Sequence, residues 1–215
     1  MDKQKRIELF KNIDLYPVTT QRLSAGRTSL EILDGLLAGG AKIVQLREKE
    51  LSMRELYELA AAFRAKTSEA GALLMINDHI DLALAVDADG VHLGRDDLPL
   101  SAARRIAPDL ILGASSHNLE QALAAQAQGA DYVNIGPIFA TGTKPEHKVF
   151  LGPAAIGEIG PHLNIPFTVM GGINRSNIAS VAAAGARRIA VVTAVTQAPD
   201  VAQAVRELRR IMLSV

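Results

Sequence analysis

The chain alternates short apolar runs with longer segments in which apolar and polar residues are mixed. Short apolar runs bounded by turn residues are typical of buried strands, whereas apolar residues about three or four positions apart indicate an amphipathic helix. The segment 52–70 shows the second pattern, with apolar residues at Leu56, Leu59, Ala60 and Phe63. Strands that alternate with helices of this length predict βαβ units and a parallel sheet.

These patterns set the predicted elements. Strands are expected at 14–19, 41–46, 72–77, 90–94, 110–115, 131–136, 166–171 and 188–193. Helices are expected at 29–38, 52–70, 80–88, 99–107, 118–128, 154–160, 174–184 and 199–212. Because no composition shift, proline-rich linker or low-complexity tract divides the chain, we expect one domain over residues 1–215.

A weak internal repeat favours a closed barrel over an open sheet. In each copy a glycine or another small residue ends a helix, and a strand follows two residues later: GGAKIVQL (39–46), DADGVHLG (87–94), GADYVNIG (129–136) and GARRIAVV (185–192). The copies fall on alternate strands of eight βα units, which predicts an α/β fold of the single (β/α)₈ or TIM barrel type. Such barrels typically span about 250 residues, so compact helices are expected here.

Composition narrows the functional classes. The 23 basic residues balance the 23 acidic ones, whereas nucleic-acid binders usually carry a basic excess. With three Tyr, five Phe and no Trp, there is little to stack bases on. The absence of cysteine excludes disulfides, thiolate nucleophiles and cysteine metal sites. With no apolar leader or membrane-length apolar stretch, we expect a cytoplasmic enzyme or small-molecule binder that binds neither nucleic acid nor membranes.

In a barrel, active-site groups follow the C-terminal ends of the strands. The second predicted strand runs into QLREK, which places Gln45, Arg47 and Lys49 on one face while the chain stays extended. An amide beside two cations suits a polyanion such as pyrophosphate. The alternative is a row of solvated loop charges, because Glu48 and Glu50 flank the lysine.

Two carboxylates follow neighbouring strands. Asp78 ends the third predicted strand, and Asp97 lies in the loop after the fourth. Mg²⁺ typically takes one or two protein carboxylates together with phosphate oxygens and water. Alternatively, Asp78 caps the helix at Ile80 and Asp97 caps the helix that Pro99 begins.

Serine and histidine give weaker signals. Ser115, at the end of the fifth predicted strand, could donate to a phosphate, or a serine there could cap the helix at Asn118. There is no G-x-S-x-G motif, and the five histidines lack metal-ligand spacing. His92, inside a strand, is expected to be a hydrogen-bonded interior residue rather than a ligand.

Two later segments suit phosphate. The long loop 137–152 contains Thr141, Thr143 and Lys144, which would suit an anion unless the loop is mobile and without function. The seventh predicted strand ends at Gly171 and Gly172 before a helix expected from Asn174, and the eighth ends at Val192 and Thr193. Loops after strands seven and eight commonly bind phosphate in such barrels.

Taken in order, these segments strongly resemble the thiamine-phosphate synthase (thiamine-phosphate pyrophosphorylase) family. The matching motifs cover nearly the whole chain: QLREK (45–49), IND (76–78), DLALAVDADGVHLG (81–94), Asp97, GASSH (113–117), GADYVNIGPIFATGTK (129–144) and GGI (171–173). The resemblance implies a (β/α)₈ barrel and a transferase reaction. In that reaction, 4-amino-5-hydroxymethyl-2-methylpyrimidine diphosphate and 4-methyl-5-(β-hydroxyethyl)thiazole phosphate give thiamine phosphate and pyrophosphate.

The resemblance also implies roles for single residues in a dissociative, Mg²⁺-assisted mechanism. Asp78 and Asp97 would bind Mg²⁺. Four residues would contact the pyrimidine diphosphate: Gln45, Arg47, Lys49 and Asn77. Ser115 and Lys144 would bind pyrophosphate. Catalytic stabilisation of the leaving group would come from Arg47, Lys49, Ser115 and Lys144. The thiazole phosphate would lie against Thr141, Thr143, Gly171, Gly172, Val192 and Thr193.

The sequence departs from the family pattern at a few positions. Arg95 stands where Gln is usual, Thr193 where Ser is common, and Arg187–Arg188 where Asp-Gly is frequent. Three rival functions remain: a thiazole tautomerase, which would need a His where Pro137 stands, an isomerase or aldolase of the phosphate-binding barrels, and a non-catalytic binding protein. Oligomeric state, including a homo-oligomer, is left open.

Overall fold

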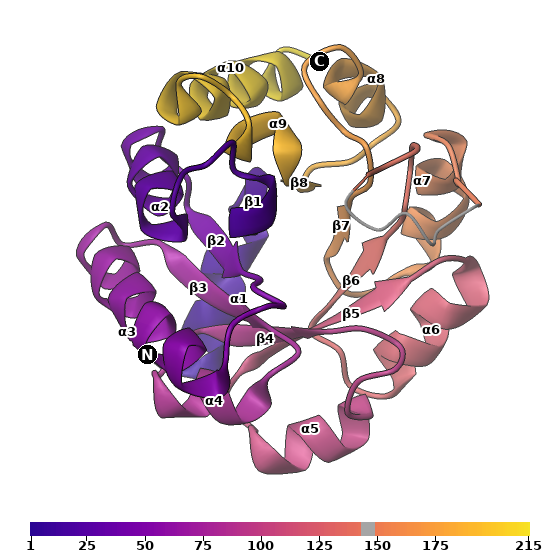
Figure 1. The fold of residues 1–215 in the computed structure, drawn as a ribbon. Helices are drawn as coiled ribbons and strands as arrows, with labels where there is room; N and C mark the ends of the chain where they lie inside the picture. Colours follow the sequence, from indigo (N-terminus) through magenta and orange to yellow (C-terminus); the bar gives the residue numbers. More distant parts are fainter. Residues whose placement is uncertain (143–148) are drawn as a thin grey trace.

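Eight parallel strands form a closed barrel in the computed structural model, which describes residues 1–142 and 149–215 (Figure 1). Each strand pairs with the next, and β8 pairs with β1. The strands are β1 (Leu15–Thr19), β2 (Ile43–Leu46), β3 (Leu73–Asn77), β4 (Gly90–Leu93), β5 (Ile111–Ser116), β6 (Tyr132–Ile135), β7 (Phe167–Val169) and β8 (Ile189–Val191). The predicted (β/α)₈ barrel is therefore confirmed.

Helices surround the barrel on its outside, except for α1, which lies at one end of it (Figure 1). They are α1 (Lys3–Lys11), α2 (Ser29–Ala38), α3 (Met53–Glu69), α4 (Ile80–Ala85), α5 (Leu100–Ile106), α6 (Leu119–Ala127), α7 (Ala154–Ile159), α8 (Ile178–Ala183), α9 (Thr193–Thr196) and α10 (Val201–Leu213). Two short 3₁₀ helices, η1 (Gln21–Leu23) and η2 (Gly160–His162), complete the set. Several helices have only six or seven residues, which is how the barrel fits a short chain.

Helices α2 and α3 begin at capping side chains. The side chains of Thr28 at α2 and Ser52 at α3 each accept from the backbone N–H three residues later. In return, the side chains of Glu31 and Glu55 accept from the backbone N–H of Thr28 and Ser52. These capping boxes satisfy backbone donors that the first turn of a helix leaves unpaired. The predicted starts at 29 and 52 therefore agree with the structure to within one residue.

The structure differs from the predicted elements at several places. Helix α1 was not predicted, because its sequence KQKRIELFK carries too few apolar residues to show a clear period. The helix expected from Asn174 begins at Ile178, since Asn174 and Asn177 form a turn in which the Asn177 N–H donates to the Asn174 carbonyl. The strand expected to reach Thr193 ends at Val191, and α9 begins at Thr193.

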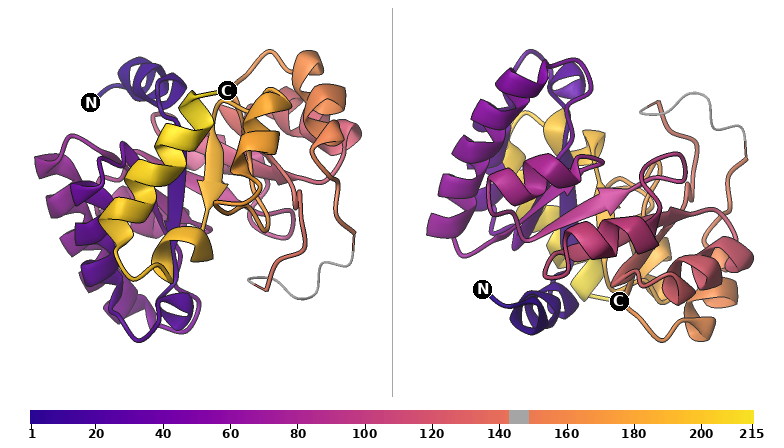
Figure 2. Two further views of the ribbon diagram at one scale, coloured as in Figure 1. Left: turned by 90° about the horizontal axis from the view of Figure 1, so that it is seen from above. Right: turned by 90° about the horizontal axis from the view of Figure 1, so that it is seen from below.

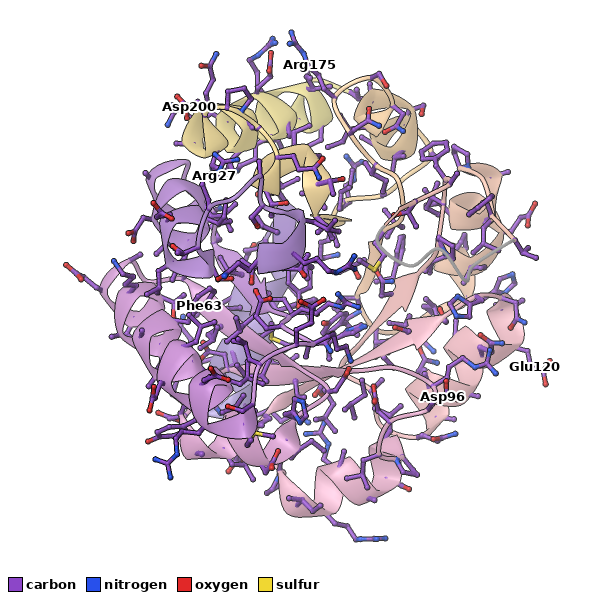
Figure 3. All side chains as sticks on the ribbon, viewed as in Figure 1. Arg27, Phe63, Asp96, Glu120, Arg175 and Asp200 are labelled. Carbon is purple, nitrogen blue, oxygen red and sulfur yellow. The ribbon has the colours of Figure 1, made fainter. Side chains whose placement is uncertain are left out.

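Two apolar clusters form the core. The larger lies between the outer face of the barrel and the helices, and it includes Phe63 of α3, which Figure 3 shows beneath that helix. Charged side chains such as Glu120, Arg175 and Asp200 point away from the barrel in the same view. The smaller cluster fills the barrel interior: Phe10, Ile13, Tyr16, Ile43, Leu73, Met75, Ile111, Tyr132 and Ala190. Burial of these large side chains leaves no open pore through the fold.

Helix α1 covers one end of the barrel. Figure 2 shows α1 at the end opposite to the described parts of the loop between β6 and α7. Phe10 of α1 is buried against Tyr132, with ring centroids 4.4 Å apart, and against Tyr16 at 6.4 Å. The interior is therefore closed at the N-terminal ends of the strands and accessible at the C-terminal ends. No helix in residues 1–142 or 149–215 combines the length and the apolar character that a membrane span requires.

Candidate active site

A cleft that is open to solvent lies at the C-terminal ends of the strands. Nine residues that the sequence predicts for the site line it: Gln45, Arg47, Asn77, Ser115, Thr141, Gly171, Gly172, Val192 and Thr193. They come from β2, β3, β5 and the segments that follow β2, β6, β7 and β8. The closed barrel thus brings together side chains that are up to 148 positions apart in the sequence.

The β2 end of the cleft is fixed by hydrogen bonds. Gln45 is buried, and its Nε2 donates to the Tyr16 hydroxyl at 2.8 Å. In the following loop, the Glu48 carboxylate accepts from the Gln21 backbone N–H at 3.0 Å and from the Ser29 hydroxyl at 2.6 Å. Glu48 is therefore not a solvated loop charge, because it ties the segment that carries Arg47 to the start of α2.

Asp78 and Asp97 lie together beside the cleft. Their carboxyl groups lie within hydrogen-bonding reach of each other, and Lys49 Nζ forms an ion pair with Asp78. The Asp97 Oδ2 also accepts from the Gly94 N–H at 2.6 Å. Asp78 and Asp97 follow neighbouring strands, and the structure brings them together as the sequence predicted.

Helix capping does not explain these aspartates. The N-cap position of α4 is His79, and that of α5 is Pro99, and neither receives a side-chain capping bond. Asp78 instead has a backbone φ of +64°, in the left-handed region that residues other than glycine rarely adopt. Strained backbone of this kind persists where the surrounding structure holds it, often at functional sites. The capping interpretation is therefore wrong for both residues.

The two carboxyl groups titrate in opposite directions. Burial alone would raise the pKa of Asp78, but hydrogen bonds from Lys49 and Asp97 and the charge of Lys49 hold that pKa below its ordinary value. Burial raises the pKa of Asp97, and the hydrogen bond and charge of Asp78 raise it further, against the Gly94 N–H. Asp78 is thus the more acidic carboxyl group of the pair, and Asp97 keeps its proton to a higher pH than an ordinary aspartic acid.

Ser115 points toward His92 on the neighbouring strand. The Ser115 Oγ lies 3.0 Å from His92 Nε2, and His92 Nδ1 lies 2.9 Å from the Tyr132 hydroxyl. His92 is buried, so the expectation of a hydrogen-bonded interior histidine is confirmed. The serine-cap alternative is wrong, because Asn118 caps α6 by accepting from the Gln121 N–H at 2.8 Å.

The β7 side of the cleft is lined by backbone. Gly171 and Gly172 have φ values of +109° and +63°. A Cβ on Gly171 would lie 2.5 Å from Pro137 Cβ, and one on Gly172 would lie 2.2 Å from the Ala140 carbonyl oxygen. Only glycine fits at both positions, so backbone atoms reach the cleft surface here. Because α8 begins only at Ile178, no helix starts directly after the glycines, where the sequence predicted one from Asn174.

The loop after β6 is described in part. Leu151 N–H donates to the Pro137 carbonyl at 2.9 Å, and Gly152 N–H donates to the Ile138 carbonyl at 3.0 Å, so the two ends of the loop pair with each other. Thr141 lines the cleft. The predicted site residues Thr143 and Lys144 lie outside the described residues.

Comparison with known proteins identifies the family. The profile of thiamine monophosphate synthase matches residues 15–195. The chain belongs to this family. A thiamine-phosphate synthase of Chloroflexus aurantiacus is 48% identical over 92% of both chains, and one of Moorella thermoacetica is 48% identical over 93% of this chain and 95% of its own. The solved thiamine phosphate pyrophosphorylase from Pyrococcus furiosus is 40% identical, with a TM-score of 0.87 over 98% of both chains.

More distant structures share only the barrel. A 3-hexulose-6-phosphate synthase matches with a TM-score of 0.68 at 19% identity over 93% of this chain. An aldolase matches at 18% identity and a TM-score of 0.71 over 96% of this chain. None of the eight strands that the structure describes contains Lys, Asp or Glu. The interior lysine or carboxylate expected of an isomerase or aldolase is therefore missing from these strands.

As a member of the thiamine monophosphate synthase family, the chain has cleft residues that its sequence did not single out. Tyr16, Asn134 and Thr168 line the cleft, and the Thr168 hydroxyl donates to Asn134 Oδ1 at 2.9 Å. Strand alternation could have found Asn134, because it shares a face with Tyr132 two residues before it. Tyr16 gave no signal, since it stands in a short, wholly buried strand.

The residues present fit the Mg²⁺ that this family implies. In the part of the chain that the structure describes, no group of three or more His, Asp and Glu side chains surrounds one point. Two adjacent carboxyl groups at the edge of the cleft match the donor set that Mg²⁺ favours, since it completes its shell with phosphate oxygens and water. Asp78 and Asp97 are the residues that would hold it.

Proposed function

We propose that the chain is a thiamine-phosphate synthase that couples 4-amino-5-hydroxymethyl-2-methylpyrimidine diphosphate to 4-methyl-5-(β-hydroxyethyl)thiazole phosphate. The observation that carries the proposal is that Arg47, Ser115, Gly171 and Gly172 all line the same cleft. Family membership and relatives that are 48% identical support the same activity. One domain, residues 1–215, would carry the whole site.

The diphosphate would bind on the β2, β3 and β5 side. Arg47 offers a planar set of donors suited to two phosphate oxygens at once, and Lys49, now paired with Asp78, offers a compact positive charge nearby. Ser115 would donate to a pyrophosphate oxygen, while Gln45 and Asn77 would orient the pyrimidine. A Mg²⁺ ion held by Asp78 and Asp97 would add positive charge beside the leaving group.

The reaction would break one bond and form another. The C–O bond between the pyrimidine methylene and the diphosphate breaks, and its electron pair leaves with pyrophosphate. The lone pair of the thiazole nitrogen then forms a C–N bond with the methylene carbon, which gives a thiazolium. Because negative charge grows on the departing pyrophosphate, donors fixed in place before the reaction lower the barrier most effectively.

The thiazole phosphate would bind on the other side of the cleft. Backbone at Gly171 and Gly172, together with Thr141 and Thr193, would hold the phosphate and place the ring nitrogen near the methylene carbon. Such positioning converts a bimolecular step into one within a single complex. Pro137 stands where a tautomerase would need a proton-transferring His and has no side-chain group that exchanges protons, which favours the coupling reaction over tautomerisation.

The test is a coupling assay. Purified protein with both substrates and Mg²⁺ is expected to form thiamine phosphate and pyrophosphate in equal amounts, measured by chromatography and a pyrophosphate-release assay. Omission of either substrate is the control and should abolish both products. Binding of both substrates without any product would overturn the proposal.

The metal is tested separately. Removal of divalent ions with EDTA is expected to abolish coupling, and added Mg²⁺ should restore it. An Asp96→Asn variant, altered at an exposed aspartate next to Asp97, serves as the matched control and should keep the wild-type dependence on Mg²⁺. A rate unchanged by EDTA would contradict the assignment of Mg²⁺.

A further inference from the structure

A continuous series of hydrogen bonds crosses the barrel interior below the cleft. Gln45 Nε2 donates to the Tyr16 hydroxyl at 2.8 Å, and the Tyr16 and Tyr132 hydroxyls lie 3.2 Å apart. Tyr132 then reaches His92 Nδ1 at 2.9 Å, and His92 Nε2 reaches Ser115 Oγ at 3.0 Å. We call these five side chains the polar chain. It connects β2 to β5 through the interior, and Gln45, His92 and Ser115 all line the cleft.

The polar chain is almost completely removed from water. The exposed fractions of Tyr16 and Tyr132 are 2% and 0%, and those of Gln45 and His92 are 5% and 8%. A buried polar group without a partner is costly, so the hydroxyl protons of the two buried tyrosines each need an acceptor within the chain. The position of one proton therefore determines the positions of the others.

The ring of Tyr132, at the centre of the chain, has little freedom to move. A Cβ on Gly113 would lie 2.1 Å from the Tyr132 ring, so the ring occupies the space that a side chain at 113 would need. Phe10 packs on Tyr132 from below, with ring centroids 4.4 Å apart. The hydroxyl of Tyr132 is therefore held between Tyr16 and His92.

The amide of Gln45 sets the direction of the chain. An amide nitrogen only donates, so the Tyr16 oxygen accepts from Gln45 and the single Tyr16 proton is directed to Tyr132. The Tyr132 proton is then directed to His92 Nδ1. Because Nδ1 accepts, the neutral imidazole carries its proton on Nε2, from which it donates to Ser115 Oγ.

We propose that the polar chain fixes His92 as the Nε2–H tautomer and thereby leaves the Ser115 hydroxyl proton free to be donated into the cleft. Tyr16, Tyr132 and His92 are then positioning residues that act through Ser115. This rests on the proposed function, in which the group that accepts from Ser115 is an oxygen of the pyrophosphate leaving group. It adds to that function a reason why a lone serine presents a donor rather than a lone pair.

The opposite direction would give a different chemistry. If His92 carried its proton on Nδ1, Nε2 would accept the Ser115 proton, and Ser115 would offer only lone pairs to the cleft. Lone pairs facing a diphosphate would repel it. A doubly protonated imidazole would donate to both neighbours and leave one tyrosine proton without an acceptor in the chain.

The two phenols keep their protons under all ordinary conditions. Burial raises the pKa of Tyr16 well above its usual value, although its bonds with Tyr132 and Gln45 lower it somewhat. Burial also raises the pKa of Tyr132 well above its usual value, and Tyr16 adds to the effect. The chain therefore holds a constant number of phenolic protons while the reaction takes place.

The first test reads the tautomer directly. Nitrogen-15 NMR of the imidazole in the substrate-free protein is expected to show His92 as neutral, with the proton on Nε2. Tyr132→Phe removes the donor to Nδ1 and should shift the ring toward a mixture of tautomers. An Nδ1–H or doubly protonated His92 in the wild type would overturn the proposal. Since no substrate is used, this result does not depend on whether the coupling reaction occurs.

The second test measures coupling between the ends of the chain. Tyr132→Phe and Ser115→Ala are each expected to weaken binding of inorganic pyrophosphate in the presence of Mg²⁺, measured by calorimetry. The loss for Tyr132→Phe should be about three- to tenfold, typical of one neutral hydrogen bond. In the Ser115→Ala background, Tyr132→Phe should have almost no further effect. Fully additive losses would show that Tyr132 acts on the fold and not through Ser115, and would overturn the proposal.

Two further variants separate positioning from stability. His92→Gln retains a donor near the Nε2 position and should bind pyrophosphate more tightly than His92→Asn, whose shorter amide reaches only the Nδ1 position. Equal losses in both would contradict the proposal. Tyr57→Phe, at the remaining tyrosine of the chain, changes an exposed ring on α3 and is the matched control. If Tyr132→Phe does not fold, Tyr16→Phe provides the same comparison one link further from Ser115.

Discussion

The two sides of the cleft present their binding groups in different ways. On the β2–β4 side, charged side chains dominate, namely Arg47, Lys49, Asp78 and Asp97, which we call the charged side. On the β7–β8 side, Gly171, Gly172, Val192 and Thr193 present mainly backbone and one hydroxyl, which we call the backbone side. Both sides would bind phosphate groups, yet among the described residues of the two sides, only those of the charged side include an ion pair and carboxyl groups with shifted pKa values.

The difference corresponds to what each phosphate does in the proposed reaction. Pyrophosphate gains charge as it leaves, so strong charges that act mainly on the departing group accelerate the step. The thiazole phosphate keeps its charge throughout and serves as an anchor, for which a backbone surface of fixed shape is sufficient. In the proposed reaction, the charged side chains are therefore concentrated around pyrophosphate, the group whose charge changes.

The largest expected effect is on the charged side. Asp78→Ala should lower kcat by a factor on the order of 10² or more, as removal of one electrostatic contact at a reacting centre commonly does. Circular dichroism should show an unchanged fold, because Asp78 caps no helix. Steady-state pyrophosphate release is the measurement, and Asp96→Ala in the neighbouring loop is the control. A wild-type rate would remove Asp78 from the reacting centre.

The next effect is on the backbone side and should fall on binding. Gly172→Ala places a Cβ 2.2 Å from the Ala140 carbonyl oxygen at a φ of +63°. We expect KM for the thiazole phosphate to rise by roughly tenfold, the equivalent of about 1–2 kcal/mol of strain, while KM for the pyrimidine diphosphate changes little.

The control for that variant is Gly129→Ala. Gly129 has a φ of +91° but has nothing within 4 Å of the added Cβ. This variant carries the same kind of backbone strain far from the cleft, so it should lose stability and keep both KM values. Equal rises in both KM values for Gly172→Ala would mean that the two sides of the cleft do not bind separate substrates.

A smaller effect concerns stability and pH. The pKa of Asp97 is higher in the folded chain than its ordinary value of about 3.9. The folded chain therefore binds this proton more tightly than the unfolded chain, and the stabilising contribution is lost as pH rises through the folded pKa. Asp97→Asn stays neutral, so in EDTA its melting temperature relative to wild type should increase from about pH 4 to pH 7.

The same variant should be nearly inactive with Mg²⁺ at pH 7. Asp97 would then be a residue that activity requires but that lowers stability at this pH. Asp96→Asn is the matched control and should show no such change of melting temperature with pH. A relative stability that falls between these pH values would contradict the assignment of the raised pKa to Asp97.

The smallest expected effect is at Arg95. This residue stands where the family usually has Gln, and it is exposed in the loop after β4. Arg95→Gln should change kcat/KM by no more than about twofold, the usual range of an exposed substitution. Initial rates measured over a range of concentrations of each substrate give kcat/KM for both. A larger change confined to the pyrimidine diphosphate would place Arg95 on the charged side.

The barrel and the placement of Asp78 and Asp97 could be predicted from the sequence, because strand order alone brings adjacent loops together. The place of Gly171 and Gly172 in the site could also be predicted, because their role depends only on the backbone freedom of glycine. Helix α1 could not be predicted, because its stability comes from Phe10 and Arg6 packing under a barrel that forms elsewhere in the chain. Periodicity within nine residues carries no information about that surface.

The polar chain could not be predicted for a related reason. Tyr16 and Tyr132 are separated by 116 positions, and their contact depends on the closure of the barrel and on ring orientations that Gly113 permits. The sequence identified His92 as an interior residue but could not name its partners. Local patterns thus located the strands and the loops that follow them, whereas the interior contacts followed from three-dimensional closure.

The pairing of β8 with β1 has a consequence for synthesis. β1 pairs with β8 at Leu15, Tyr16 and Pro17, whereas β7 pairs with β8 only between Val169 and Ile189. Until the segment 189–191 has left the ribosome, the growing sheet has two free edges, and free strand edges are sites of aggregation. Contacts between such distant parts of the chain also form slowly. A nascent chain stalled before β8 should therefore be the most aggregation-prone form of this protein.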